Sequence, residues 1–276
     1  MVLLINELFY SIQGEGLSTG IPTTFIRTTG CNLRCSWCDT SYAYEEGEKM
    51  TVDQILNTVK EIRETHGHDD VCLTGGEPLE QQEAAELILR LLSDGYVITL
   101  ETNGTKSLAS LFQHLHEYSL GKKRDTIENE SSTPEESTGN DSEDPQGSPS
   151  FLDMKDRLHV SLDIKCPSSG ESQMMNLMNL NILTKGDQLK FVVRDEEDLD
   201  FAFSLLLANP VFCTTIIQPV IPKIEVQGAG TTNGPVFQSQ RIRTLVERFL
   251  ANRPKGLDIR FMLQQHKMIW GDQRGV

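Results

Sequence analysis

The chain has 276 residues, enough for one large domain or two small ones with a full hydrophobic core. Its formal net charge of -15 argues against a general nucleic-acid or membrane-surface binder, because both targets are anionic and attract basic patches. The first residues show no basic stretch followed by a long apolar one, and no later run approaches about 18 apolar residues. We therefore expect a cytoplasmic protein with neither signal peptide nor membrane span, in which thiols stay reduced.

The predicted elements alternate between strands and helices along the chain. Strands are predicted at residues 3–10, 22–27, 70–73, 96–102, 157–163, 188–193, 214–217 and 258–263. Helices are predicted at residues 51–66, 80–92, 107–116, 174–183, 196–207 and 236–250. This alternation indicates βαβ units and a parallel sheet, so the predicted class is α/β. About six repeats predict an incomplete (β/α)6 barrel instead of the closed eight-fold one.

Residues 119–150 differ sharply in composition from the rest of the chain. Between Asp125 and Ser150 there are eight acidic residues and no Lys or Arg, among many Ser, Pro, Gly, Asn and Thr. Such a segment buries too little apolar surface to offset its ordering entropy, so we predict a disordered acidic insertion. The expected organisation is one domain over residues 1–276, interrupted at about 119–150.

Three cysteines, Cys31, Cys35 and Cys38, fall within eight residues on a predicted loop. An iron-sulfur cluster held by protein alone needs four cysteines, so a set of three would leave one iron open to another ligand. A structural zinc site would need four closed ligands, commonly in two cysteine pairs, and the sequence has no second pair. The other cysteines, Cys72, Cys166 and Cys213, stand alone and are expected to be buried hydrophobic side chains.

Two glycine-rich turns follow predicted strands. Gln13-Gly-Glu-Gly16 presents Glu15 from a backbone with little side-chain bulk, which lets it approach a ligand closely. Thr74-Gly-Gly-Glu-Pro78 lacks the Lys-Ser/Thr of a phosphate-binding loop and carries an acidic residue, which favours a positively charged ligand group. Between them, Arg27 ends a strand just before the cysteines, and its planar guanidinium suits a carboxylate.

These motifs together resemble a known family. The CxxxCxxC spacing from Cys31 to Cys38 and the Gly75-Gly-Glu77 turn are similar to the radical S-adenosylmethionine (SAM) superfamily. The upstream Gln13-Gly-Glu-Gly16 resembles one family within it, 7-carboxy-7-deazaguanine synthase. Leu263–Gly271 is similar to that family's C-terminal segment, and 163–170 to its SAM-contacting stretch, with Asp163 where the family has Ser. The resemblance runs from Phe9 to Gly271 and fails only across the insertion.

The resemblance implies a site and its cofactors. Implied substrate contacts are Ile12, Gln13, Gly14, Glu15, Arg27 and Thr74. Implied SAM contacts are Ser36, Trp37, Cys38, Asp39, Gly76, Glu77, Asp163, Lys165 and Gln218. The implied metal ligands are Cys31, Cys35 and Cys38 for a [4Fe-4S] cluster and Thr40 for Mg²⁺. The implied fold is the incomplete barrel of the radical SAM type.

The resemblance also implies an activity. It is the conversion of 6-carboxy-5,6,7,8-tetrahydropterin to 7-carboxy-7-deazaguanine with loss of ammonia, a step toward queuosine or archaeosine. A flavodoxin or ferredoxin would supply the electron, and the family leads us to expect a homodimer without direct nucleic-acid contact. Two alternatives remain: a glycyl-radical-enzyme activase, and a non-catalytic iron-sulfur or zinc protein. The Gln13–Gly16 turn beside Arg27 and Thr40 favours a small substrate.

Overall fold

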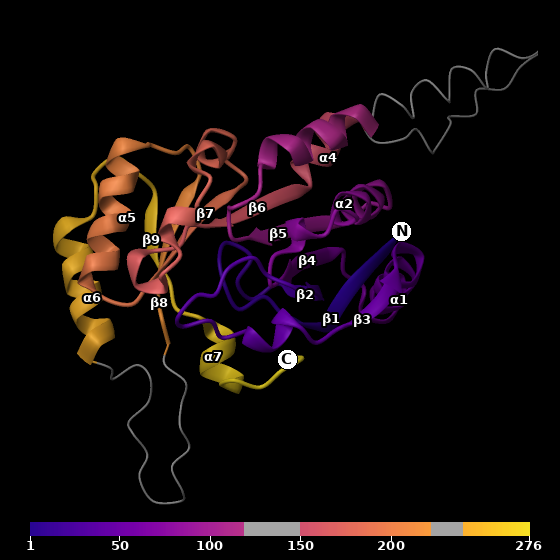
Figure 1. The fold of residues 1–276 in the computed structure, drawn as a ribbon, viewed down its shortest axis with the longest axis horizontal. Coiled ribbons are helices and arrows are strands. Elements are labelled where there is room, and N and C mark those ends of the chain that lie inside the picture. Colours follow the sequence, from indigo (N-terminus) through magenta and orange to yellow (C-terminus); the bar gives the residue numbers. More distant parts are fainter. Residues whose placement is uncertain (119–149, 222–239) are drawn as a thin grey trace, which may run out of the picture.

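The computed structural model describes residues 1–118, 150–221 and 240–276, and one nine-stranded sheet runs through them (Figure 1). Its order is β3-β1-β2-β4-β5-β6-β7-β8-β9. The strands are β1 (Val2–Ile12), β2 (Pro22–Thr28), β3 (Glu48–Thr51), β4 (Asp70–Gly75), β5 (Val97–Thr102), β6 (Leu158–Asp163), β7 (Gln188–Val193), β8 (Thr214–Pro219) and β9 (Ile259–Phe261). β1 is antiparallel to β2 and β3, and every other neighbouring pair is parallel.

Helices flank the sheet along its length. They are α1 (Val52–His66), α2 (Ala84–Ser93), residues 108–118, α4 (Phe151–Asp156), α5 (Glu196–Ala208), α6 (Gln240–Asn252) and α7 (Gln265–Trp270). Figure 1 shows α5 and α6 beside the β7–β9 end and α1 and α2 beside the β1–β5 end. Across the described ranges β3 and β9 remain the two ends of the sheet, so the barrel is incomplete. The predicted α/β class is confirmed, and so is the parallel sheet for β2 and β4–β9, whereas β1 runs antiparallel to its neighbours.

The boundaries of α1 follow from local capping. Thr51 accepts a hydrogen bond from the backbone N–H of Gln54, and the Gln54 side chain accepts one from the Thr51 N–H. This reciprocal capping box satisfies two of the orphan donors at the helix start. At the other end Gly67 adopts a left-handed conformation with φ 69°, where a residue without Cβ is unstrained. The helix predicted at 51–66 therefore begins at its cap residue, Thr51.

The helix predicted at residues 174–183 is wrong. The structure has the short 3₁₀ turns η4 (Ser172–Met174) and η5 (Leu177–Asn181) there instead. The Asn176 side chain accepts from the Met178 N–H, and buried Asn179 bonds to the backbone of Gly104, Lys106 and Leu108. Asparagine side chains that bond to backbone groups compete with helix formation.

One other predicted helix begins later than expected, and two predicted segments lie mostly or partly outside the described residues. The helix predicted at 80–92 begins only at Ala84 as α2, because Glu80 ends the 3₁₀ turn η2 (Pro78–Glu80) and residues 81–83 form a turn. The predicted insertion at 119–150 lies outside the described residues except for Ser150, which caps α4. The start of the predicted helix 236–250, residues 236–239, also lies outside them.

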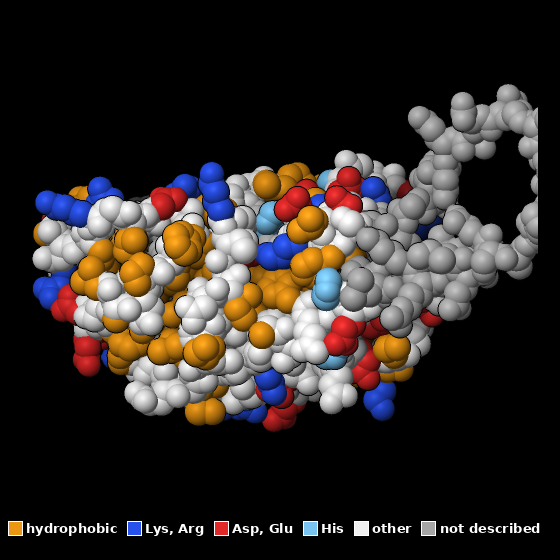
Figure 2. Space-filling model, turned by 90° about the horizontal axis from the view of Figure 1, so that it is seen from above, with side chains coloured by type: hydrophobic (Ala, Val, Ile, Leu, Met, Phe, Trp, Pro, Cys, Tyr) orange, Lys and Arg blue, Asp and Glu red, His pale blue; other side chains and the backbone are white. Residues whose placement is uncertain are grey.

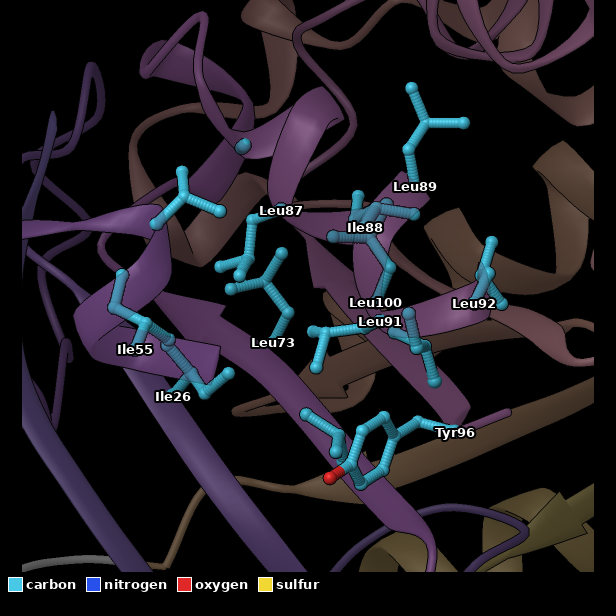
Figure 3. Close-up of a cluster of buried hydrophobic side chains, with 14 of the residues drawn as sticks. Ile26, Ile55, Leu73, Leu87, Ile88, Leu89, Leu91, Leu92, Tyr96 and Leu100 are labelled. Atoms are coloured by element: carbon cyan, nitrogen blue, oxygen red, sulfur yellow. The ribbon is translucent and has the colours of Figure 1, made fainter. Parts of the chain in front are cut away.

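The core forms two clusters of buried apolar side chains. One lies between β1–β5 and the helices α1 and α2, and Figure 3 shows Ile26, Ile55, Leu73 and Leu87 pointing toward one another in it. The other lies between β6–β9 and the helices α5 and α6. Figure 2 shows one face of the molecule, with hydrophobic patches between charged side chains of both signs. Among the described helices, none has the length and apolar character needed to cross a bilayer.

Leu73→Ala should destabilise the fold strongly. Leu73 is completely buried in the first cluster, so its truncation leaves a cavity beneath β4. We expect a loss of about 2–5 kcal/mol in unfolding free energy, measured by chemical denaturation. Leu207→Ala is the control because Leu207 is 67% exposed, and it should change stability by less than about 0.5 kcal/mol. Equal losses in the two variants would contradict the packing described.

Candidate active site

A cavity of about 250 Å³ lies at the carboxyl ends of the parallel strands. Loops after β1, β2, β4, β5 and β6 contribute to its wall, together with β7, the end of β8 and the segment after β9. In α/β barrels this end of the sheet is where loops can be shaped for a ligand without disturbing the core. Two chemically different sides face each other across the cavity, one with the cysteines and one with buried charged groups.

All three loop cysteines line the cavity and are free thiols. Cys31 Sγ accepts hydrogen bonds from the Leu33 N–H at 3.4 Å and from Asn103 Nδ2 at 3.8 Å. Burial raises the pKa of the Cys35 thiol to about 11. Such a thiol becomes a good ligand when a bound metal takes the place of its proton.

The cysteine loop fits a cluster better than a single ion. Within residues 1–118, 150–221 and 240–276, no three His, Cys, Asp or Glu side chains are grouped closely enough to hold one metal ion. The three thiols therefore do not form a ready mononuclear zinc site. Three cysteines around one cavity match a four-iron cluster whose last iron takes a ligand from the cavity.

A network behind the loop holds Ser36 and Trp37 in place. Trp37 Nε1 donates to Ser168 Oγ at 3.1 Å, and the Ser36 hydroxyl donates to the Ser168 carbonyl at 2.7 Å. Ser168 is itself fixed by Asp198 of α5, which accepts from its N–H at 2.9 Å and from its hydroxyl at 2.5 Å. Asp198 is completely buried. The cysteine loop is thus tied to the start of α5 through the turn η3 (Pro167–Ser169).

The glycine turn after β4 packs directly on the cysteine loop. A Cβ on Gly76 would collide with the Gly30 carbonyl, and a Cβ on Gly75, with φ 156°, would collide with Thr28. The Gly76 and Glu77 N–H groups donate to the carbonyls of Thr28 and Gly30 at 3.2 and 2.8 Å. The two glycines are therefore required for the approach of two chain segments, in addition to any ligand contact.

Glu77 and Ser36 are the two predicted site residues that do not line the cavity. Glu77 is completely buried, and its carboxylate accepts from Thr102 Oγ1 at 2.9 Å and from the Asn103 N–H at 2.6 Å. Burial raises the pKa of Glu77 despite these donors. Glu77 therefore joins the β4 turn to the end of β5, while Ser36 bonds to η3.

On the opposite side of the cavity, Glu15 is held by three donors. Lys190 of β7 lies 2.9 Å away, Gln218 of β8 donates at 3.0 Å, and Gln264 after β9 donates at 2.7 Å. Burial alone would raise the pKa of Glu15, but the charges of Lys190 and His266 outweigh it and hold the pKa well below 4.5. Glu15 is therefore an ionised acceptor inside the protein.

Two acceptor atoms near Glu15 have no partner within the described part of the chain. They are Asp163 Oδ1 and Gln218 Oε1, both buried. The other Asp163 oxygen pairs with Lys165 at 2.9 Å, and Lys190 lies 3.8 Å from it. Buried polar atoms are almost always hydrogen-bonded in native proteins, so unpaired acceptors at a cavity indicate where ligand N–H or O–H groups bind.

Arg27 reaches the cavity from the end of β2. Its Nε donates to Glu7 Oε2 at 2.9 Å, which leaves the two terminal nitrogens of the guanidinium for a ligand. Nearby, Thr74 donates to Glu101 at 2.9 Å and Gln13 donates to it at 3.3 Å. Glu101 is thus a further carboxylate of the cavity, and it accepts hydrogen bonds from two predicted substrate contacts.

Thr40 and Asp39 sit beside the cysteines. The Thr40 hydroxyl donates to Asp39 Oδ1 at 2.7 Å, and Lys267 of α7 lies 3.4 Å from Asp39 Oδ2. Burial acts to raise the pKa of Asp39, but the Lys267 charge and the Thr40 bond lower it overall. The Thr40 oxygen and the Asp39 carboxylate are hard ligands of the kind Mg²⁺ prefers.

The remaining predicted site residues all line this one cavity. They are Ile12, Gln13, Gly14, Glu15, Arg27, Cys31, Cys35, Trp37, Cys38, Asp39, Thr40, Thr74, Gly76, Asp163, Lys165 and Gln218. Sequence reasoning missed several charged or polar lining residues. They are Glu101, Lys190, Gln264, His266, Lys267 and Asp272. A charged Lys190 inside the apolar run of β7 was a signal for one of them.

Similarity to known proteins agrees with this site. Residues 25–122 match the Radical SAM superfamily, a range that holds the three cysteines and the glycine turn. The 7-carboxy-7-deazaguanine synthase of Thermoplasma acidophilum is 30% identical over 99% of this chain and 100% of its own length. That of Koribacter versatilis is 32% identical over 96% of each chain.

A solved structure is similar in fold. The crystal structure of QueE from Escherichia coli aligns with a TM-score of 0.57 over 96% of this chain and 95% of that chain, at 19% sequence identity. The fold and the three-cysteine site define a radical SAM protein. Within that class, the chain belongs to the 7-carboxy-7-deazaguanine synthase family.

Glu15→Gln should reduce stability in a pH-dependent way. The folded protein lowers the pKa of Glu15 below 4.5, so its ionised form stabilises the fold fully above about pH 4.5. We expect a deficit of about 3 kcal/mol at pH 7, since Lys190 loses its closest partner. The deficit should shrink as the pH falls below about 4.5, measured by denaturant unfolding at each pH. A deficit that stays constant down to pH 3 would show that the Glu15 charge is not involved.

Ser168→Ala should loosen the cysteine loop. The substitution removes the acceptor of the Trp37 N–H and one donor to Asp198. We expect the lost hydrogen bonds to destabilise the loop by about 1 kcal/mol, which corresponds to about fivefold faster release of iron from the reconstituted protein. The control is Ser110→Ala on an exposed helix face, which should release iron at the wild-type rate. Equal rates in both variants would argue against the Ser168 anchor.

Proposed function

We propose that this chain is a radical SAM carbon-nitrogen lyase that converts 6-carboxy-5,6,7,8-tetrahydropterin to 7-carboxy-7-deazaguanine with loss of ammonia. The observation that carries the proposal is that one cavity joins the three-cysteine loop to Glu15 and Arg27. Family membership over nearly the full length supports the same reaction. The product would feed queuosine or archaeosine formation.

Cys31, Cys35 and Cys38 would hold a [4Fe-4S] cluster, with SAM beside it. When bound, this pair supplies a 5'-deoxyadenosyl radical able to remove a hydrogen atom from C6 of the pterin. Trp37, Asp163 and Lys165 line the cavity next to one another and are among the residues proposed to contact SAM. The others are Ser36, Cys38, Asp39, Gly76, Glu77 and Gln218. The buried Asp163 Oδ1 provides a free acceptor for a SAM hydroxyl or amino group.

The remaining work of the protein is to position the pterin. The terminal nitrogens of Arg27 would bind the pterin carboxylate, a planar pairing that a guanidinium makes well. The ionised Glu15 would accept N–H groups from the opposite edge of the ring. Thr74 and Gln13 are held by Glu101 and would border the ring between these two anchors. Contacts at both ends of the pterin would hold it in one orientation, with C6 directed toward the radical.

We also propose Mg²⁺ at Thr40, where the hydroxyl and the neighbouring Asp39 carboxylate are available oxygen ligands. An octahedral ion would need further oxygens from water and substrate. A flavodoxin or ferredoxin as electron donor, a homodimer and a cytoplasmic location remain proposals drawn from the family. The single interrupted domain is supported by one sheet that contains both the first and last strands.

The alternatives are less well supported. A glycyl-radical-enzyme activase would bind a protein segment, whereas the buried charged groups of this cavity, Glu15, Arg27 and Lys190, are suited to a compact polar ligand. A zinc or electron-transfer protein does not need a substrate pocket, so that interpretation leaves the buried Glu15–Lys190 pair at the cavity unexplained. Curated relatives with the synthase name cover the whole chain.

Arg27→Ala should separate substrate binding from SAM cleavage. The variant lacks the guanidinium that would bind the pterin carboxylate. Product formation under anaerobic conditions should therefore fall at least about 100-fold. SAM cleavage by the reduced protein should continue without coupling to product, as measured by 5'-deoxyadenosine. The exposed Arg253→Ala is the control and should keep full turnover. Unchanged product formation in Arg27→Ala would remove Arg27 from the proposed site.

A further inference from the structure

The residues after α7 close one end of the cavity. Five of the six residues in the tail segment, defined as residues 271–276, line it. Asp272 pairs with Lys267 at 2.8 Å, and Lys267 also reaches Asp39 beside the cysteine loop. Arg274 is the tail residue that does not line the cavity, and its side chain makes a different set of contacts.

Arg274 is held by three groups from the start of the chain. Its Nε lies 3.2 Å from Glu7 Oε1, its Nη1 lies 3.1 Å from Glu46 Oε2, and its Cζ lies 3.8 Å from the centroid of the Tyr42 ring. A guanidinium that stacks on an aromatic ring and forks between two carboxylates is well restrained. The tail segment is therefore fastened over β1 and the turn η1 (Ser41–Tyr44).

Glu7 connects this fastening to the substrate pocket. It pairs directly with Arg27 across the antiparallel strands β1 and β2, next to a register irregularity between Ile5 and Glu7. Bulges of this kind re-aim side chains close to functional sites. One Glu7 oxygen faces Arg274, and the other accepts from Arg27 at 2.9 Å and from Tyr42 at 3.3 Å.

We propose that Arg274 is a positioning residue for the pterin carboxylate, acting through Glu7 on Arg27. The terminal torsion of a glutamate is broad, so contacts on one oxygen alone leave the plane of the Glu7 carboxylate free to turn. Arg274 on one oxygen leaves the other for Arg27 and so fixes the guanidinium with its terminal nitrogens at the cavity. This inference rests on the proposed function and names a residue of that same site.

The inference is tested with Arg274→Gln. The variant keeps a polar side chain and loses the charge, so Glu7 keeps its contacts with Arg27 and Tyr42 on one oxygen but loses the charged partner of the other. The orientation of the Glu7 carboxylate, and with it that of Arg27, is then less restrained. We expect the KM for carboxytetrahydropterin to rise about three- to tenfold. The KM for SAM and the rate of uncoupled SAM cleavage should not change. Arg248→Gln is the matched control. Arg248 of α6 also pairs with two carboxylates, Glu196 and Asp200 of α5, and none of the three lines the cavity.

Two further variants separate positioning from a general loss of structure. Arg274→Lys can pair with one carboxylate and should recover part of the pterin affinity. In a double-mutant cycle, Arg274→Gln should add little to the KM already raised by Glu7→Gln, because both act through the same contact. Additive effects, or a SAM KM that rises together with the pterin KM, would overturn the inference.

The result for the wild type distinguishes this inference from the proposed function. If the wild-type protein forms product and Arg274→Gln has an unchanged pterin KM, the positioning role is wrong and the proposed function stands. If the wild-type protein forms no product from the pterin, the proposed function fails and this inference fails with it.

Discussion

The buried carboxylate of Glu15 is the group on which the arrangement of the cavity depends. It belongs to the loop after β1, near one end of the sheet, and its donors come from β7, β8 and the segment after β9 at the other end. Because the barrel is incomplete, strand pairing does not join these two ends in the described residues, although the Gln265 N–H donates to the Gly14 carbonyl at 2.9 Å. The polar network around Glu15 connects the loop after β1 to β7, β8 and the segment after β9. Gly14 packs on His266 in the same region.

The cysteine side depends on a second close approach, between the β4 turn and the loop after β2. Gly75 and Gly76 permit that approach, and the buried Glu77 joins it to the end of β5. The two sides of the cavity are therefore built by different means. Backbone contact and a buried network shape the cluster loop, whereas ion pairs shape the pocket of Glu15 and Arg27. A radical reaction needs both, because the reactive carbon must be fixed next to the cofactor and shielded from water.

Much of this site could be predicted because its residues are local in sequence. The spacing of Cys31, Cys35 and Cys38 and the two glycine turns are short motifs. The cysteine loop and the Gly75–Gly76 turn follow the parallel strands β2 and β4, which puts them at the same edge of the sheet. The turn after β1 follows an antiparallel strand, and it contacts the segment after β9 instead. The roles of Glu7 and Arg274 could not be predicted because they arise from contacts between separate strands and the tail segment. The charge of Lys190 in β7 was a local signal, but its partner Glu15 is distant in sequence. The helix expected at 174–183 failed for a related reason, since the distant backbone partners of Asn179 decide its conformation.

The central claim is that three thiols hold a cluster with one iron open to SAM in the same cavity as Glu15 and Arg27. Electron paramagnetic resonance of the anaerobically reconstituted, reduced protein tests it most directly. We expect a [4Fe-4S]⁺ signal that changes when SAM is added, in both the wild type and Glu15→Gln. A protein that takes up zinc in place of iron, or a cluster whose signal is unchanged by SAM, would contradict the account.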